Sequence, residues 1–128
     1  MINSFYAERS ILLNTIISKL INSLNTSTDK VQLLILGAGY DDSYESNNAI
    51  IYIVDLPKII EERVNSNTTT DNTTYISCDL RDTELLIQKL IDNNFDSSIN
   101  TVILLGILLF TYTSNSTNIK YRMRLELY

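Results

Sequence analysis

The segment at residues 31–42, VQLLILGAGYDD, constrains the fold of this chain more than any other stretch. Five of the six residues at 31–36 are apolar, which is typical of a strand buried on both faces of a parallel sheet. Gly37 and Gly39 follow, and they are two of only three glycines in the chain. Because glycine has no Cβ, the backbone here can turn tightly and lie against a ligand. Ligands of open α/β sheets bind outside the carboxyl ends of the strands, so this loop is the first candidate site.

The rest of the chain predicts alternating helices and strands. Apolar residues at helical spacing indicate an amphipathic helix over 5–24. A helix is expected to start at Pro57, with Val64 on its inner face and Arg63 outward, and another over 83–91. Apolar runs predict strands at 49–54, 75–78 and 101–105, the last extending through Gly106 to Leu109 as an alternative. This order is the front half of a doubly wound α/β domain.

Residues 113–128 are too few to supply the further strands that would complete such a sheet. We therefore expect a single partial domain over 1–128, with an incomplete sheet. The outer flank of the strand at 101–105 is expected to be left uncovered.

Composition and charge exclude several classes of function. The net charge of −5 and the absence of a basic run argue against unaided binding to nucleic acid. A single cysteine, Cys78, and no histidine exclude an intramolecular disulfide, a multi-cysteine zinc site and histidine-based catalysis. The polar first ten residues do not read as a secretory signal, and the apolar run at 101–112 is shorter than the roughly 20 residues that span a bilayer. We expect a cytoplasmic protein that does not enter a membrane.

Acidic residues follow the next two strands, and they suggest a nucleoside ligand. Asp55 lies 16 residues after Gly39, close to the spacing of an acid that binds a ribose diol, and Asp79 ends the third strand. A phosphate ligand fits less well, because the loop lacks the G-x-G-x-x-G pattern and Asp41 and Asp42 would repel a pyrophosphate. S-adenosylmethionine, a nucleoside with a sulfonium and an ammonium group and no phosphate, suits an acidic pocket.

Each of these residues also has an ordinary structural interpretation. The two glycines can simply form a turn, and Asp55 can cap the helix that starts at Pro57. Asp79 and Asp82 can be turn or cap residues. Cys78 can be a small buried side chain and Arg9 a solvated charge. The joint order of the residues favours the binding site.

Four segments resemble the leucine carboxyl methyltransferase family, which also contains the wybutosine-synthesising carboxyl methyltransferases that modify tRNA. Residues 2–9 (INSFYAER) are similar to its I-N-R-G-Y-x-x-R, and residues 31–42 to its Q-(I/V)-V-x-L-G-A-G-x-D-T. Residues 52–57 (YIVDLP) resemble (F/Y)-x-E-V-D-(F/L)-P, and residues 75–82 (YISCDLRD) resemble Y-x-x-x-x-D-L-R-D. A looser similarity continues through 101–112, so the resemblance covers 1–112 and leaves 113–128 as a divergent tail.

The resemblance implies a Rossmann-like domain that binds S-adenosylmethionine. Arg9 would contact the methionine carboxylate, and Gly37 and Gly39 would form the cofactor loop. Asp55 would hold the ribose. The adenine would lie between two further residues, Asp79 and Leu80.

The implied reaction is methyl transfer to a carboxylate, typically the C-terminal leucine of the protein phosphatase 2A catalytic subunit. A carboxylate is already ionised and nucleophilic at neutral pH, so catalysis is mainly positioning, and no catalytic residue is assigned.

The resemblance implies a sheet that is incomplete at both ends, because the family's amino-terminal segment with its cofactor-contacting lysine and the family's carboxyl-terminal half have no counterpart in residues 1–128. The chain also departs from the family pattern after the fourth strand. Gly106 stands where the family has an acid, and Thr111 where it has a tyrosine. Three alternatives therefore stay open: a catalytically silent relic or binding module, the tRNA-modifying branch, and, more distantly, a dinucleotide-dependent dehydrogenase.

Overall fold

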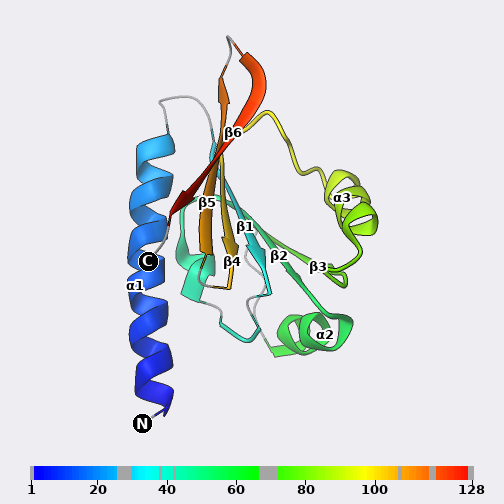
Figure 1. Cartoon of the computed structure of the whole chain (residues 1–128). Helices are drawn as coiled ribbons and strands as arrows, with labels where there is room; N and C mark the ends of the chain where they lie inside the picture. Colours follow the sequence, from blue (N-terminus) through cyan, green and yellow to red (C-terminus); the bar gives the residue numbers. More distant parts are fainter. Residues whose placement is uncertain are drawn as a thin grey trace.

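The fold is built on one six-stranded sheet with the strand order β3-β2-β1-β4-β5-β6. The computed structural model describes residues 2–25, 30–37, 39–41, 43–66, 72–106, 108–115 and 118–126. Its elements are α1 (Ile2–Leu24), β1 (Gln32–Leu36), the 3₁₀ helix η1 (Ser43–Ser46), β2 (Ile50–Asp55), α2 (Pro57–Ser66), β3 (Thr73–Ser77), α3 (Thr83–Asp92), β4 (Thr101–Leu105), β5 (Leu108–Asn115) and β6 (Asn118–Glu126). Figure 1 shows α1 and α3 on opposite faces of the sheet.

The first four strands are parallel, and β1 lies at their centre. Leu34 of β1 pairs with Tyr52 of β2 on one side and with Ile103 of β4 on the other. The chain therefore leaves β1 in one direction and returns on its other side, which makes the end of β1 the topological switch point. The α/β, Rossmann-like arrangement predicted from the sequence is confirmed.

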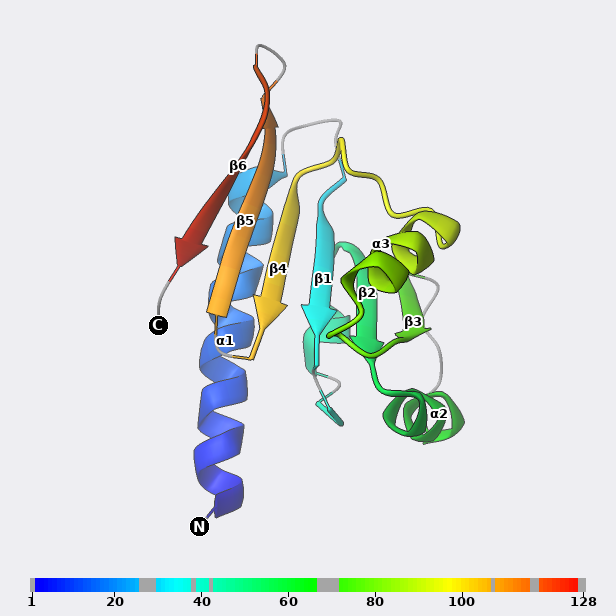
Figure 2. The ribbon, with the colours of Figure 1, turned by 45° about the vertical axis from the view of Figure 1, so that its right-hand side comes forward.

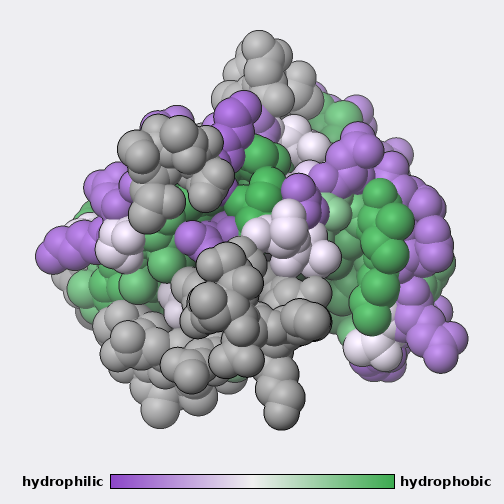
Figure 3. Space-filling view, turned by 90° about the horizontal axis from the view of Figure 1, so that it is seen from above, coloured by the Kyte–Doolittle hydropathy of each residue, from purple (hydrophilic) through white to green (hydrophobic). Residues whose placement is uncertain are grey.

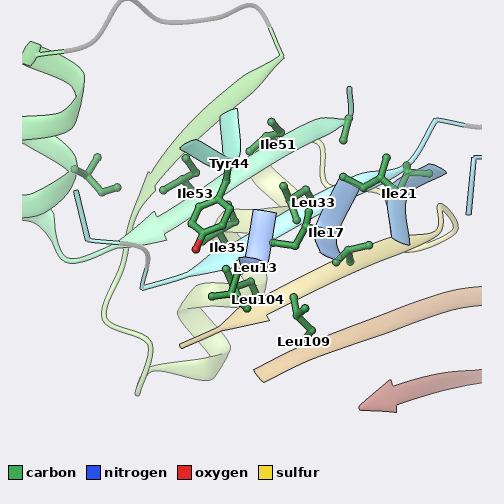
Figure 4. Packing of buried hydrophobic residues seen from close by; sticks show 14 residues of the cluster. Leu13, Ile17, Ile21, Leu33, Ile35, Tyr44, Ile51, Ile53, Leu104 and Leu109 are labelled. Atoms are coloured by element: carbon green, nitrogen blue, oxygen red, sulfur yellow. The ribbon is translucent and has the colours of Figure 1, made fainter. Parts of the chain in front are cut away.

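Alternation along the strands produces two apolar layers. Leu33 and Ile35 of β1 pack on the face that is covered by α1, together with Ile17 from that helix (Figure 4). Leu34 faces the other way, into a smaller cluster to which α3 contributes Leu90. Both faces of β1 are thus buried, as its largely apolar sequence requires.

Apolar surface remains exposed on the outer side of α3. Figure 3 views the molecule from above, and hydrophobic residues gather there on the α3 side, at the right. Two isoleucines of α3, Ile87 and Ile91, lie one helical turn apart and are exposed. Among the described residues, no helix combines the length and the apolar character needed to cross a membrane.

The chain beyond β4 differs from the prediction, because it forms two further strands. Gly106 has a φ of 62° and reverses the chain, so that β5 returns antiparallel along β4, with Leu105 paired to Leu108. The alternative of one strand running from 101 to 109 is therefore wrong. The flank of β4 that was expected to be uncovered is paired with β5, and β6 pairs with β5 in turn.

Helix α1 is longer than predicted, since it begins at Ile2. Its amino-terminal half extends past the carboxyl ends of the parallel strands (Figure 2). The amino-terminal half of α1, the part of the helix to which Arg9 belongs, therefore lies at the same edge of the sheet as the loop after β1.

Candidate functional site

The candidate site lies at the carboxyl ends of β1, β2 and β3, where hydrogen bonds join the loops. The amide of Gly37 donates to the carbonyl of Val54, with an N···O distance of 2.8 Å. The amide of Cys78 donates to the carbonyl of Asp55 at 2.9 Å. These hydrogen bonds continue the strand pairing beyond the sheet. They bring together the segments that follow β1, β2 and β3, which the sequence predicts to form the site.

Both glycines of the loop adopt left-handed backbone conformations. Gly37 has a φ of 80° and Gly39 a φ of 62°, values that strain residues with a Cβ. A Cβ on Gly39 would meet nothing within 4 Å, so open space lies beside it. A Cβ on Gly37 would stand 3.7 Å from Cδ1 of Leu80, which places that side chain against the loop. Ala38 and Asp42, from the same motif, lie outside the described residues.

The Asp55 side chain is buried and holds the loop. The residue is only 7% exposed, and its Oδ2 accepts the amide of Gly39 at 2.9 Å while Oδ1 accepts the amide of Leu56 at 2.8 Å. A helix cap would bond the second or third amide of α2, so Asp55 reaches across to the glycine loop instead of capping that helix. An ionised carboxylate has about four lone-pair positions, which leaves about two for ligand hydroxyls.

Arg63 is a member of the site that the sequence analysis missed. It was expected on the outer face of α2, but it is 1% exposed, while Val64, expected inside, is 45% exposed. Arg63 follows the buried Ile60 by three residues and therefore shares its face of the helix. Its Nη1 donates to the carbonyl of Gly39 at 2.9 Å, and its Cζ lies 5.6 Å from the centre of the Tyr75 ring, within reach of a cation–π interaction.

Asp79 and Asp82 both have the turn and cap roles that were left open. Oδ1 of Asp79 accepts the backbone amide of Arg81 at 2.9 Å, and the Arg81 guanidinium forms an ion pair with Oδ2 at 2.7 Å. This hydrogen bonding lowers the pKa of Asp79 to about 2. Asp82 caps α3 by accepting the amide of Leu85 at 3.2 Å. Asp79 is therefore a carboxylate at the rim of the site that stays ionised at all physiological pH values.

Cys78 and Tyr40 also lie in the loops of this edge. Cys78 is buried, and its thiol donates to the carbonyl of Asp79 at 3.4 Å, in agreement with a small core residue. Tyr40 is exposed, and its hydroxyl donates to a carboxylate oxygen of Glu62, which raises the pKa of the tyrosine.

A buried amide ties the loop after β1 to helix α1. The side-chain nitrogen of Asn47 donates to Oδ1 of Asn14 and to the carbonyl of Tyr44, both at 2.8 Å. Its oxygen accepts the hydroxyl of Ser18 at 2.7 Å. The helix that carries Arg9 is thus fixed to the segment that follows the glycine loop, although the Arg9 side chain itself lies outside the described residues.

The structure brings together five of the six predicted binding residues, and the sixth is Arg9. Contacts join Gly37 to Leu80 and Gly39 to Asp55. Asp79 directly precedes Leu80 in the loop after β3. A separate pocket lies at the opposite, amino edge of the sheet, lined by Asn25, Asn48 and Asn72 among others. Ligands of open α/β sheets bind at the carboxyl edge, so this pocket is not part of the candidate site.

Comparison with known proteins adds one finding. A family model described as leucine carboxyl methyltransferase matches residues 2–118. No curated protein and no solved structure matches the chain. The matched segment contains every element from α1 to β5, and with them all the residues of the candidate site.

Proposed function

Because the chain belongs to the leucine carboxyl methyltransferase family, we propose that it binds S-adenosylmethionine at this site and methylates the C-terminal leucine carboxylate of a protein phosphatase 2A catalytic subunit. Carboxyl methyl transfer is the activity of the family. The phosphatase substrate, the cofactor contacts and a cytoplasmic location are the proposal.

The hydrogen bond from the Gly39 amide to the Asp55 carboxyl group is the main observation that supports this proposal. It sets a buried carboxyl group beside a loop with open space at its second glycine. The free lone pairs of Asp55 suit the two hydroxyls of a ribose. Leu80 supplies an apolar surface next to Gly37 for a base. The residues present therefore fit a nucleoside cofactor.

Methyl transfer to a carboxylate requires the protein mainly to bind and align the two reactants. When bound, S-adenosylmethionine supplies an electrophilic methyl group. The acceptor carboxylate is ionised at neutral pH and needs no general base. The described residues accordingly bind and orient, and alignment of the reacting groups is the main source of rate. The acidic net charge also suits a cofactor that bears two cationic groups.

A second candidate is cofactor binding without methyl transfer. The position where the family pattern has an acid after the fourth strand is Gly106, which forms the turn between β4 and β5. No side chain is available there. If that acid is needed to align the acceptor, the chain binds the cofactor and transfers nothing.

The test is transfer of a labelled methyl group from S-adenosylmethionine to a peptide with the phosphatase C-terminal sequence. The matched control is the same peptide with its leucine carboxylate converted to an amide. We expect base-labile label, typical of a methyl ester, on the free carboxylate alone.

The other outcomes separate the alternatives. Label on tRNA, added in a parallel reaction, would replace the phosphatase substrate by the tRNA-modifying branch. Label on neither acceptor, with cofactor binding intact, would favour the second candidate.

A further inference from the structure

We propose that Arg63 is a positioning residue that fixes the conformation of the glycine loop for the cofactor. The inference rests on the proposed function for its ligand. It concerns a residue of α2 that neither the sequence motifs nor the family match assigns to the site.

Arg63 and Asp55 hold Gly39 from two different elements. Asp55, at the end of β2, accepts the Gly39 amide, and Arg63, on α2, donates to the Gly39 carbonyl. The amide belongs to the peptide plane before the Gly39 Cα, and the carbonyl belongs to the plane after it. Holding both planes fixes both φ and ψ of this residue. Glycine is the residue for which such restraint matters most, because it has the widest conformational freedom.

The guanidinium is itself well anchored. The residue is almost fully buried, and the Tyr75 ring from β3 lies 5.6 Å from its Cζ. A guanidinium is planar and always charged, so it can stack on a ring and donate a directed hydrogen bond at once. Burial of a charge is costly unless its hydrogen bonds are made, which disfavours any conformation in which the Gly39 carbonyl turns away.

The loop in turn determines the geometry of Asp55. One oxygen of that carboxylate is committed to the Gly39 amide and the other to Leu56, so its remaining lone pairs have fixed directions. If Arg63 is removed, the carbonyl plane of Gly39 is free to rotate and the loop samples other conformations. The ribose acceptor then has to be organised during binding, which weakens affinity.

The experiment compares Arg63→Met with native protein and with Lys58→Met. Methionine keeps an unbranched apolar stem and removes every donor. Lys58 is exposed on the same helix, so its substitution makes the same change in net charge away from the loop. Two quantities are measured for each variant: the dissociation constant for S-adenosylmethionine, and the hydrogen-exchange rate of the Gly39 amide by NMR, with the amide of Ile35 in β1 as the reference for global opening.

We expect Arg63→Met to weaken cofactor binding about tenfold or more, as for loss of a hydrogen bond to a charged group. The Gly39 amide should exchange faster by a similar factor while Ile35 is unchanged. Arg63→Lys should fall between, because it keeps the charge and loses the planar fork. Lys58→Met should match the native protein in both measurements.

The two readouts separate this inference from the proposed function. If native protein binds the cofactor and Arg63→Met binds as tightly, or if Gly39 exchange does not change, the positioning role is overturned. If folded native protein does not bind the cofactor, the proposed function fails. The exchange rate of Gly39 then decides by itself whether Arg63 fixes the loop.

Discussion

The two acidic residues of the site, Asp55 at the end of β2 and Asp79 in the loop after β3, lie in different surroundings. Asp55 is buried and bonded to two backbone amides, whereas Asp79 is partly exposed and paired with the guanidinium of Arg81. A buried carboxylate with fixed lone pairs suits recognition of a ligand's hydroxyl groups. An ion pair at the surface contributes little to stability, so Asp79 and Arg81 mainly fix the turn at the rim of the site.

The pairing of Asp79 predicts a pKa effect. Arg81→Ala removes the side-chain hydrogen bonds that lower the pKa of Asp79 to about 2, so this pKa should rise toward 3.8. The Arg81 backbone amide still donates in the variant, so the rise should be incomplete. The measurement is an NMR pH titration of side-chain carboxyl carbons. Asp96, whose pKa is lowered by Ser98, is the internal control and should not change.

The sign of the pH dependence follows from the direction of this shift. A carboxyl whose pKa is lowered by folding stabilises the folded state at pH values above its unfolded pKa, near 3.8. That contribution is lost as the pH falls from 3.8 through about 2. It should be reduced in Arg81→Ala. An unchanged Asp79 pKa in the variant would show that the ion pair does not form in solution.

Among single residues, those that directly follow a strand could be predicted from the sequence. Arg63 could not, because its role depends on a tertiary contact. Gly37, Gly39 and Asp55 follow strands, and a parallel sheet brings strand ends together. Arg63 is a charged residue in a polar stretch of α2, where periodicity alone favours an outward position. Its burial depends on an acceptor, the Gly39 carbonyl, that is distant in sequence.

Among the elements, the β4–β5 hairpin changes the expected architecture most. It adds β5 and β6 to the edge of β4 and buries Leu109 in the core beneath α1. Leu105, on the other side of the turn, is 42% exposed, whereas Leu109 is 0% exposed. These two leucines provide a matched pair for testing the hairpin.

Leu109→Ala should lower the free energy of unfolding by about 2–5 kcal/mol, since it leaves a cavity in a packed core. Leu105→Ala should change it by only about 0.5 kcal/mol, as is usual for exposed positions. Urea denaturation of both variants and of native protein gives the comparison. Equal losses for the two variants would contradict the antiparallel placement of β5.

The hairpin could not be predicted because its sequence is ambiguous. Residues 101–112 are a nearly continuous apolar run, and such a run fits one long strand or two short ones. The distinction depends on the left-handed conformation of Gly106. Three of the four parallel strands were predictable, since each is a short apolar run bounded by polar residues or glycine. The third, β3, was predicted at 75–78 and spans Thr73–Ser77, because its first two residues are threonines that give no apolar signal.

At the scale of the whole molecule, the family of the chain and the position of its candidate site agree. The chain belongs to the leucine carboxyl methyltransferase family over residues 2–118, and its Rossmann-like sheet brings the predicted loop residues to one edge. We propose that this edge binds S-adenosylmethionine through Asp55. The acceptor and the transfer step depend on that claim.

The most direct test is calorimetric titration of the folded chain with S-adenosylmethionine, compared with Asp55→Ala and Asp92→Ala. Asp92 is an exposed acid at the end of α3, so its variant makes the same charge change away from the loop. We expect saturable binding that Asp55→Ala weakens by about 1–3 kcal/mol, the usual cost of leaving buried polar groups unpaired, and that Asp92→Ala leaves unchanged. Failure of the folded native chain to bind, or equal affinity in Asp55→Ala, would contradict the account.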